Sequence, residues 1–480
     1  MKSNKSKQID RRNFLKLAGA AIVLPTILPG CMTGRPTKKI SANDKVNIGV
    51  VGWGMQGPSN TKSFMFENDC RVVAACDLDQ EALKRAVDTI NDNYENKDCA
   101  AYHDYRELFA RPDLDAVMLA VPDHWHAIVA TAAAKRGLHI YGEKPLAKTI
   151  AEQQAIVHAV EKNNIIWQTG SWQRSQAPFH KAAEIVRNGL IGEVTHVEVG
   201  LPSGHHDFKG TELELLKKFQ DLPENFDINN PKDRARVDFL SRVVPDGNDW
   251  KIATSEQPPA ELDYETWIGP SKMEPYIKQR VHMNWRWNYN TGGGQLLDWV
   301  GHHLDIAHWG LGFDNSGPST IEGQGEFPAP NALWNTCTKY RIELKYPRNI
   351  TMTIAGGHSD IKSGTKWIGT EGWVWVDRGG FDASNPDWKK GKSLPEELRK
   401  VKLIESPGHW RNHLDSIRSG QPTIAPAQTA HHSAIPGHLG LISMLTGRKI
   451  NWDVKHEKII GDAEASKLLT REYRAPYHLA

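Results

Sequence analysis

The sequence contains little cysteine, no large excess of charge and no hydrophobic run long enough for a membrane span. Five cysteines occur in 480 residues, and four of them, Cys70, Cys76, Cys99 and Cys337, show no metal-ligand spacing. So few cysteines exclude a disulfide framework, although one bridge stays open. The formal net charge of +2 gives no electrostatic case for binding nucleic acid. The apolar run at residues 17–28 is too short for a stable span.

That apolar run is typical of an export signal. It follows a basic segment with Arg11 and Arg12, and it ends in small residues. The paired arginines resemble a twin-arginine signal, which directs export of folded proteins. The residues before Cys31 resemble a lipobox, in which Cys31 would be lipidated and attach the protein to a membrane. We therefore expect residues 1–31 to be a signal peptide, residues 32–44 a linker, and the protein to be periplasmic or in the cell envelope; a cytoplasmic enzyme with a basic amphipathic start is the alternative.

A glycine-rich turn follows the first expected strand. Residues 46–51 read as a buried strand, and residues 52–57 follow it in the pattern GxGxxG before helix-compatible sequence. The first glycine permits the tight turn, the second lets backbone amides approach a pyrophosphate, and the third allows close helix packing. A second apolar strand, residues 71–76, ends in Asp77, whose carboxylate can bind both ribose hydroxyls and would repel a 2′-phosphate. The sequence therefore predicts a dinucleotide site for NAD rather than NADP.

Strands and helices alternate through the first third of the chain. Further strands are expected at residues 116–121, 138–141 and 165–169, and helices at residues 126–135 and 150–162. This order implies right-handed parallel crossovers, and hence an α/β fold with a doubly wound Rossmann sheet over residues 45–174. Ligands of such sheets bind beyond the carboxyl ends of the strands. The candidate cofactor-binding residues are Gly52, Gly54, Met55, Gln56, Gly57, Asp77, Pro122, His124, His126, Glu143 and Lys144.

The pattern changes after residue 174. A helix at 178–188 and an alternating strand at 194–199 precede a long irregular stretch, residues 202–285, which looks like an insertion. Three glycines at 292–294 then begin a helical pattern that runs to about residue 310. Strands at 337–344, 350–355 and 373–376 predict an open, mainly antiparallel sheet, and a helical segment at 434–445 could pack back on the first domain. We expect an α/β domain for substrate and oligomerisation over residues 175–450, then a C-terminal extension at 451–480.

This order of motifs resembles the glucose-fructose oxidoreductase / inositol dehydrogenase (Gfo/Idh/MocA) family. The resemblance rests on Glu143-Lys144-Pro145 after the fourth strand and on Gly-Gly-Gly-x-x-x-Asp-x-x-x-His at residues 292–302, and it covers nearly all of residues 45–450. It implies a Rossmann domain, a second domain with an open sheet, homo-oligomers (dimers or tetramers) formed through that sheet, and sugar or polyol substrates. Lys144, Asp298 and His302 match the lysine, aspartate and histidine of the family's motifs.

The chemistry of these three side chains fits hydride transfer without the resemblance. Asp298 and His302 are four residues apart on the expected helix, so they share a face and the carboxylate can orient the imidazole. Histidine can take a hydroxyl proton as hydride leaves the same carbon, and Lys144 can stabilise the negative charge that develops on the oxygen. Each residue alone could be a surface or capping residue. Together, behind a Rossmann site, they are the candidate catalytic residues.

Five other side chains are weaker candidates for substrate contact. Two of them leave the last Rossmann strand at the cleft, two precede the three glycines, and one follows the candidate catalytic histidine. They are Gln173, Arg174, Arg286, Tyr289 and His303. Adjacent histidine pairs occur three times, but neighbouring residues point apart, so they rarely hold one ion, and no metal site is predicted.

An exported NAD enzyme would have no free NAD pool to draw on, so its cofactor must leave bound and be regenerated within the site. A sugar oxidoreductase meets this condition if it oxidises a ring hydroxyl such as that at C3 and passes the hydride to a second sugar. A redox-neutral NAD-dependent glycosidase also meets it, because transient oxidation acidifies a neighbouring C–H and permits elimination of the aglycone. The motifs do not separate these two functions. A non-catalytic sugar-binding lipoprotein is a third alternative, against which the three candidate catalytic residues argue.

Overall fold

The computed structural model describes residues 44–205, 257–328, 332 and 334–479, which belong to one compact unit of the chain. The predicted signal peptide, Cys31, nearly all of the predicted linker and residues 206–256 of the predicted insertion lie outside the described residues. Within the described part, no helix has the length and apolar character needed to cross a bilayer. The four cysteines in this part are buried free thiols, and no group of three or more metal-ligating side chains gathers there.

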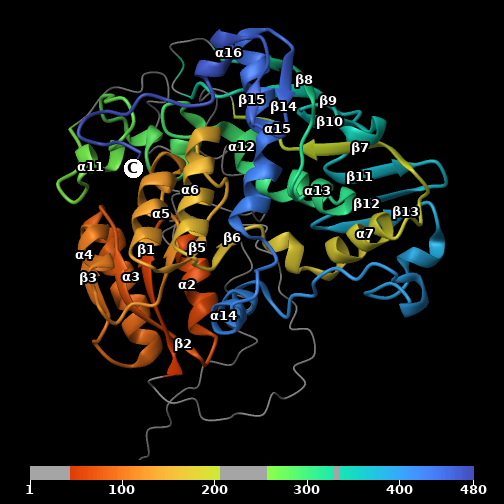
Figure 1. The fold of residues 1–480 in the computed structure, drawn as a ribbon. Helices are drawn as coiled ribbons and strands as arrows, with labels where there is room; N and C mark the ends of the chain where they lie inside the picture. The colour runs from red at the N-terminus through yellow and green to blue at the C-terminus, as the bar shows by residue number, and fades with distance from the viewer. Residues whose placement is uncertain (1–43, 206–256, 329–331, 333, 480) are drawn as a thin grey trace, which may run out of the picture. The chain divides into compact units, whose positions relative to one another are not determined.

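The N-terminal domain is a Rossmann fold, as predicted. Its six parallel strands lie in the order β3-β2-β1-β4-β5-β6 (Figure 1). They are β1 (Val46–Val51), β2 (Cys70–Cys76), β3 (Ala100–Tyr102), β4 (Ala116–Leu119), β5 (His139–Gly142) and β6 (Trp167–Thr169). The helices are α2 (Gly57–Met65), α3 (Gln80–Tyr94), α4 (Tyr105–Phe109), α5 (His126–Lys135) and α6 (Ile150–Lys162).

Burial on both faces explains the continuous apolar runs of this sheet. In β1, Val51 belongs to one hydrophobic cluster and Val50 to another, so successive side chains enter opposite cores. The first turn of α6 is fixed by a capping box in which Thr149 and Glu152 bond each other's backbone N–H groups. That cap fixes the chain shortly after β5, where Lys144 lies.

The second domain is an α/β domain with a nine-stranded, mainly antiparallel sheet, again as predicted. The strand order is β13-β12-β11-β7-β10-β9-β8-β14-β15, and among the described strands of this second sheet only β7 and β10 pair in parallel. The strands are β7 (Val194–Leu201), β8 (Thr320–Glu326), β9 (Lys339–Lys345), β10 (Thr351–Gly356), β11 (Gly364–Gly369), β12 (Trp373–Asp377), β13 (Gly380–Ala383), β14 (Ile450–Asp453) and β15 (Lys458–Ile459).

The remaining helices follow β6 in the chain. They are α7 (Ala177–Arg187), α11 (Tyr264–Ile268), α12 (Gly294–Trp299), α13 (Asp305–Leu311), α14 (His409–Ser419), α15 (Ala427–Thr446) and α16 (Ala463–Lys467). As the sequence suggested for residues 434–445, α15 packs back on the first domain, and it contacts both α6 and β8 (Figure 1). The shorter α14 packs on α2. These contacts place the carboxyl edge of the Rossmann sheet against the second domain.

Two predicted boundaries do not follow the structure. The described part of the insertion packs on the Rossmann domain, because Leu262 and Trp267 form a small core with Leu78. The boundary at residue 450 falls on β14, which pairs with β8, and residues beyond it return to the first domain, where Arg471 binds Glu152 at 2.8 Å. The described part of residues 202–285 and the residues after 450 are therefore parts of the fold, although their charged, irregular sequence does not predict this.

Candidate active site

The glycine loop after β1 has the shape that a dinucleotide requires. Gly52 has φ +93°, and a Cβ there would lie 2.5 Å from the carbonyl oxygen of Ala120. A Cβ on Gly57 would lie 2.1 Å from the carbonyl oxygen of Gly52, so α2 can approach the loop only without a side chain. A Cβ on Gly54 would meet nothing within 4 Å, which leaves open space where a pyrophosphate would lie. The loop therefore fits NAD; side-chain contacts of Met55, Gln56 and Pro122 with it stay predictions.

Two carboxylates flank this loop. Asp77 ends β2, and its Oδ2 accepts a 2.6 Å hydrogen bond from the backbone N–H of Trp53 within the loop. Burial raises the pKa of Asp77, against the hydrogen bonds from the Asp79 and Trp53 backbones. Glu143 follows β5, and its Oε1 accepts a 2.8 Å hydrogen bond from Asn60 of α2. Both predicted cofactor residues thus lie at the carboxyl edge of the sheet, where such ligands bind.

Lys144 reaches across from the Rossmann edge to α12. Its Nζ donates to Asp298 Oδ1 at 2.8 Å and to the backbone oxygen of Asp298 at 3.2 Å. Arg286 donates from Nε to the same Oδ1 at 3.3 Å. Burial alone would raise the pKa of Asp298, but the charges of Lys144 and Arg286 outweigh it and lower that pKa. An ammonium has three N–H donors, so one N–H of Lys144 remains for another partner.

His302 is next to this pair, but not in the way the spacing predicted. A π-helical turn, Val300–Leu304, interrupts the helix between α12 and α13, and the wider turn removes the i,i+4 alignment on which the predicted contact depended. The carboxylate of Asp298 binds Lys144 and Arg286 instead, so its predicted role in orienting the imidazole is wrong. The π turn itself packs on Lys144, because a Cβ on Gly301 would lie 2.8 Å from the Cβ of Lys144.

The imidazole of His302 is buried and accepts or donates no hydrogen bond among the described residues, and its Nδ1 has no solvent contact. Burial, followed by the charges of Arg378 and Lys144, lowers the pKa of His302 well below its ordinary value. The ring is therefore neutral at physiological pH, which is the form that can accept a proton. Trp172 and Trp299 contact it, with ring centroids 6.1 and 5.4 Å away.

Sequence reasoning missed one carboxyl group of the site. Asp123 belongs to the polar segment after β4, is 3% exposed, and has an Oδ1 without a hydrogen-bond partner. Burial, followed by the charge of Asp298, raises the pKa of Asp123 to about 8, although Arg286 and Lys144 oppose this. The sequence signal for Asp123 is its position beyond the carboxyl end of β4. The nearby His124 and His126 are the residues of this segment that were predicted to bind the cofactor.

Both of these histidines contact backbone oxygens of the protein. His126 places Nδ1 2.8 Å from the backbone oxygen of Pro145 and Nε2 2.9 Å from that of Val121, and its neutral ring donates to one of these two oxygens. His124 places Nε2 2.9 Å from the backbone oxygen of Trp267 and is 1% exposed. Burial lowers the pKa of both rings. Both nitrogens of His126 lie against backbone oxygens, so its predicted cofactor contact is corrected: this side chain fixes the loops after β4 and β5. The predicted cofactor contact of His124 stays a prediction.

Arg174 is also structural rather than a substrate residue. Its side chain is 2% exposed, and it binds Asp305 at 2.7 Å and Asp314 at 2.7 Å. Asp305 in turn accepts a hydrogen bond from Ser433 of α15 at 2.7 Å. Gln173 places Nε2 3.4 Å from Nδ1 of His303, whose Nε2 lies 3.3 Å from Asp377.

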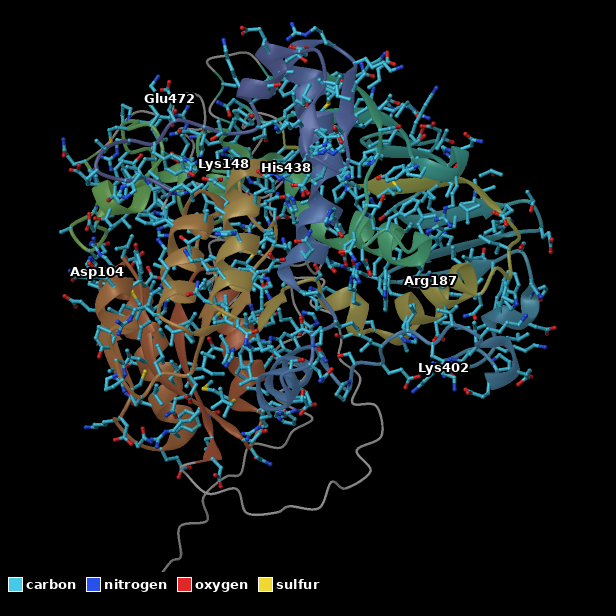
Figure 2. The ribbon with its side chains drawn as sticks, viewed as in Figure 1. Asp104, Lys148, Arg187, Lys402, His438 and Glu472 are labelled. Carbon is cyan, nitrogen blue, oxygen red and sulfur yellow. The ribbon has the colours of Figure 1, made fainter. Side chains whose placement is uncertain are left out.

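Tyr289 lies in a different cavity from the candidate catalytic residues. This cavity, of about 310 Å³, is lined by Tyr289, Lys148, His438 and Glu472 among others, but by none of Lys144, Asp298 and His302. Figure 2 labels Lys148, His438 and Glu472. The Lys148 ammonium lies 4.5 Å from the centroid of the Tyr289 ring and donates to the backbone oxygen of Gly292 at 3.1 Å. The predicted substrate contact of Tyr289 is therefore not supported. Lys148 holds the glycine segment before α12 in place.

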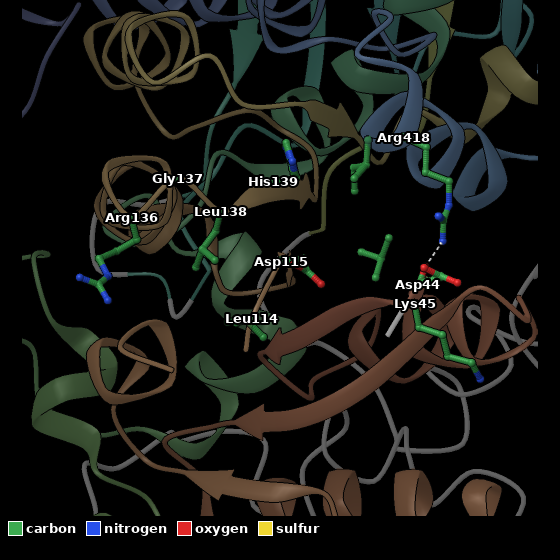
Figure 3. Close-up of a pocket in the computed structure, with 11 residues that line it drawn as sticks. Asp44, Lys45, Leu114, Asp115, Arg136, Gly137, Leu138, His139 and Arg418 are labelled. Carbon is green, nitrogen blue, oxygen red and sulfur yellow. Dashed lines mark hydrogen bonds between the residues drawn. The ribbon is translucent and has the colours of Figure 1, made fainter. Parts of the chain in front are cut away.

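A further cavity, of about 390 Å³, lies at the opposite edge of the Rossmann sheet (Figure 3). Its lining includes Lys45 and Val46 at the start of β1, His139 at the start of β5, and Arg418, which donates to the backbone oxygen of Asp44 at 2.8 Å. Ligands of doubly wound sheets bind at the carboxyl ends of the strands. We therefore assign the chemistry to the edge that holds Lys144 and His302.

Comparison with known families agrees with this division of the chain. Residues 46–171 match the family described as "Oxidoreductase family, NAD-binding Rossmann fold", and residues 247–479 match "Oxidoreductase family, C-terminal alpha/beta domain". The cofactor predicted for the glycine loop, NAD, is thereby confirmed.

Individual relatives cover less of the protein or are more distant. A Glycosyl hydrolase family 109 protein of Shewanella baltica is 31% identical over 211 residues, which are 40% of this chain and 45% of that protein. The chain thus spans about half the length of such relatives. Aldose-aldose oxidoreductase from Caulobacter crescentus, complexed with glycerol, aligns over 85% of this chain and 99% of its own at 18% identity and a TM-score of 0.56. WlbA dehydrogenase from Bordetella pertussis, in complex with NADH and UDP-GlcNAcA, aligns over 85% and 99% at 14% identity and a TM-score of 0.56.

Proposed function

Because this chain belongs to the Gfo/Idh/MocA oxidoreductase family and has its NAD-binding domain, we propose that it is an exported enzyme that oxidises a ring hydroxyl of a sugar or glycoside with NAD that stays bound. The observation that carries the proposal is the junction of Lys144, Asp298 and His302 at the carboxyl edge of the Rossmann sheet. There, one ammonium N–H and a neutral imidazole have no partner among the described residues. Both are needed at a hydroxyl that loses its proton.

The side chains divide the work between them. Bound NAD supplies a hydride acceptor at this edge of the sheet. The remaining N–H of Lys144 donates to the substrate oxygen and stabilises the negative charge that develops on it. His302 accepts the hydroxyl proton, because its lowered pKa keeps it neutral beforehand. Asp298 is a positioning residue: through two hydrogen bonds from Nζ, it fixes where the ammonium of Lys144 points.

A second candidate function is supported by the relatives' names. Proteins named as family 109 glycosyl hydrolases share 31% identity with 211 residues of this chain. A redox-neutral glycosidase would use the same proton and hydride transfers, lose the proton of the neighbouring C–H together with the aglycone, add water to the unsaturated ketone that forms, and return the hydride to the carbonyl carbon. The structural neighbours include an aldose-aldose oxidoreductase and a dehydrogenase in complex with UDP-GlcNAcA, which support a saccharide substrate under either function.

Export, attachment and assembly are part of the proposal. The twin arginines at residues 11–12 support export of the folded protein with NAD already bound, and Cys31 supports attachment by a lipid. We propose a periplasmic or cell-envelope location and a homo-oligomer formed through the nine-stranded sheet. Replacing both arginines by lysine would leave a twin-arginine substrate in the cytoplasm, and Cys31→Ser would release a lipoprotein from the membrane fraction; normal delivery or unchanged fractionation would contradict the respective part.

The test of the chemistry begins with the purified protein. Denaturation should release about one NAD per chain, and mixing the native protein with saccharides and aryl glycosides should reduce the bound NAD in a single turnover. Net conversion of a sugar to a keto sugar or lactone would support the oxidoreductase. Release of the aglycone without net oxidation would support the glycosidase. A protein that binds saccharides but never reduces its NAD would overturn both and leave a sugar-binding protein.

A further inference from the structure

Arg378 occupies an unusual place beside the candidate catalytic histidine. It directly follows β12 in the second domain. Its Cζ lies 4.6 Å from the ring centroid of Trp172, in the turn after β6, and 4.5 Å from that of Trp299, at the end of α12. One guanidinium is thus held between two indole rings, one from each domain. Stacking of this kind fixes the plane of an arginine while it leaves the N–H donors at its edge free.

Within the described part of the chain no carboxylate pairs directly with this guanidinium, although the charges of Asp298 and Asp377 act on it without a direct contact. Among the described residues it makes no ion pair or side-chain hydrogen bond, and its Nε is buried without a partner. The neighbouring Asp377 accepts a hydrogen bond from Ser363 at 2.7 Å and lies 3.3 Å from His303. The carboxylate of Asp298 is bound by Lys144 and Arg286. Burial lowers the pKa of Arg378 to about 10, so the group is still a cation at neutral pH.

The guanidinium is also close to the proposed chemistry. Trp172 and Trp299, which hold Arg378, are the same two rings that contact the imidazole of His302. A partly desolvated cation without a partner is costly, and an anion brought by a ligand would remove that cost. The flat fork of an arginine matches a carboxylate with two parallel hydrogen bonds.

We propose that Arg378 binds a carboxylate of the substrate, which makes the substrate an acidic saccharide, a uronate or a glycoside of one. The inference rests on the proposed sugar oxidation at Lys144 and His302, and it adds the class of sugar. Trp172 and Trp299 hold the guanidinium so that the ring hydroxyl to be oxidised lies at His302 while the carboxylate lies at Arg378. No sequence motif indicates this site, because residues 172, 299 and 378 come together only in the folded chain.

The test compares matched pairs of ligands on the NAD-loaded protein. Methyl glycosides of glucuronate, galacturonate and mannuronate are each paired with the neutral hexose glycoside, which has a hydroxymethyl group in place of the carboxylate. Calorimetry gives binding, and the absorbance of reduced NAD gives turnover. At least one uronate should bind about 100-fold more tightly than its neutral partner, and Arg378→Gln should abolish that preference, since a buried charge pair loses this much when one partner is truncated. Arg378→Lys should restore part of it.

The matched control is Arg348→Gln, which removes a guanidinium that stacks 4.7 Å from the ring of Phe313 and touches none of these residues. It should keep the preference. Equal binding of acidic and neutral partners, or an unchanged preference in Arg378→Gln, would overturn the inference. So would loss of bound NAD from Arg378→Gln, because the guanidinium would then serve the cofactor. Uronate binding that depends on Arg378 without NAD reduction would support the carboxylate site and overturn the proposed oxidation; equal NAD reduction by both partners would do the reverse.

Discussion

Two ion pairs connect the carboxyl edge of the Rossmann sheet to the helix of residues 294–311, and they differ in what they leave unsatisfied. Arg174 and Asp305 are each 2% exposed, and Asp314 and Ser433 satisfy their remaining groups. Lys144 and Asp298 are 12% and 18% exposed, and the ammonium keeps one free N–H. We call Arg174–Asp305 the closed pair, because its charged groups are bound within the protein. We call Lys144–Asp298 the open junction, because it has a free N–H and lies beside the imidazole of His302 and the guanidinium of Arg378, which have no hydrogen-bond partner among the described residues.

The difference shows which charges can act on a ligand. A buried pair with every donor satisfied has nothing to offer a substrate, and it contributes by holding two domains in one arrangement. A pair with donors left over imposes a cost on the free protein that a ligand can remove. Sequence alone treats Arg174 and Lys144 alike, since both are cations just beyond a Rossmann strand.

The largest effect on the free energy of unfolding is expected when the pair of Arg174 and Asp305 is broken. Arg174→Met should lower the free energy of unfolding by about 3–5 kcal/mol, because Asp305 and Asp314 would be left without their buried counter-charge. Urea denaturation followed by fluorescence measures this. Arg71→Met is the control: its pair with Asp98 is 37% and 68% exposed and should contribute less than about 1 kcal/mol. Equal losses from both variants would show that the Arg174 cluster is not a structural junction.

The next effect is expected at the open junction, where substitutions should lower the rate at which bound NAD is reduced. His302→Ala and Lys144→Ala should each lose about 10²–10⁴-fold in the single-turnover reduction of bound NAD, because each removes a group that acts on the reacting hydroxyl. Bound NAD and the unfolding midpoint should change little. Lys84→Ala, which breaks an exposed pair with Asp88, controls for the loss of a lysine. Reduction at the wild-type rate in His302→Ala would move the base elsewhere.

The fold was predictable because its signals are local. The glycine pattern at residues 52–57 and the apolar runs of β1 and β2 carry the Rossmann prediction, and α5 and α6 begin and end where the periodicity placed them. In the second sheet, β8 escaped notice because only Ile321 of its seven residues is buried, and glycines interrupt its alternation. A strand with so few buried residues lacks the alternation of apolar and polar side chains by which a strand is predicted.

The site was predictable only in part, because its geometry is not local. Lys144, Asp298 and His302 were found from motifs, but the π turn that separates the last two has no sequence signal. Asp123 and Arg378 carry no motif that indicates their roles, since their significance comes from neighbours far away in the chain: Asp298 for Asp123, and Trp172 and Trp299 for Arg378. Conversely, a polar residue beyond a strand end need not contact a ligand: both ring nitrogens of His126 lie against backbone oxygens of the protein itself.

A smaller effect on the rate is expected when the carboxylate of the open junction is replaced by an amide of the same shape. Asp298→Asn retains an oxygen that can accept from Lys144, but a neutral acceptor makes a weaker hydrogen bond than a carboxylate, by about 1 kcal/mol. We expect a loss of about tenfold in the rate of NAD reduction, mostly in kcat, because the ammonium is held less firmly. Asp298→Ala should lose more. If Asn and Ala variants behaved alike, the carboxylate would not act by positioning Lys144.

The last effect concerns Asp123 and appears only as a dependence on pH. Burial, and then the charge of Asp298, raises the pKa of Asp123 to about 8, whereas an aspartate of an unfolded chain titrates near about 3.9. Between these values the folded protein binds one proton more at this residue than the unfolded chain does, so its contribution to the free energy of unfolding falls as pH rises and becomes constant above about pH 8. Asp123→Asn cannot release that proton, and its amide resembles the neutral carboxyl group. The stability of the variant relative to wild type should therefore increase from about pH 5 to about pH 8 and then level off, as measured by urea denaturation across that range. Parallel curves would show that Asp123 is ionised in the folded protein, held by Lys144 and Arg286, and that the open junction carries two carboxylates rather than one.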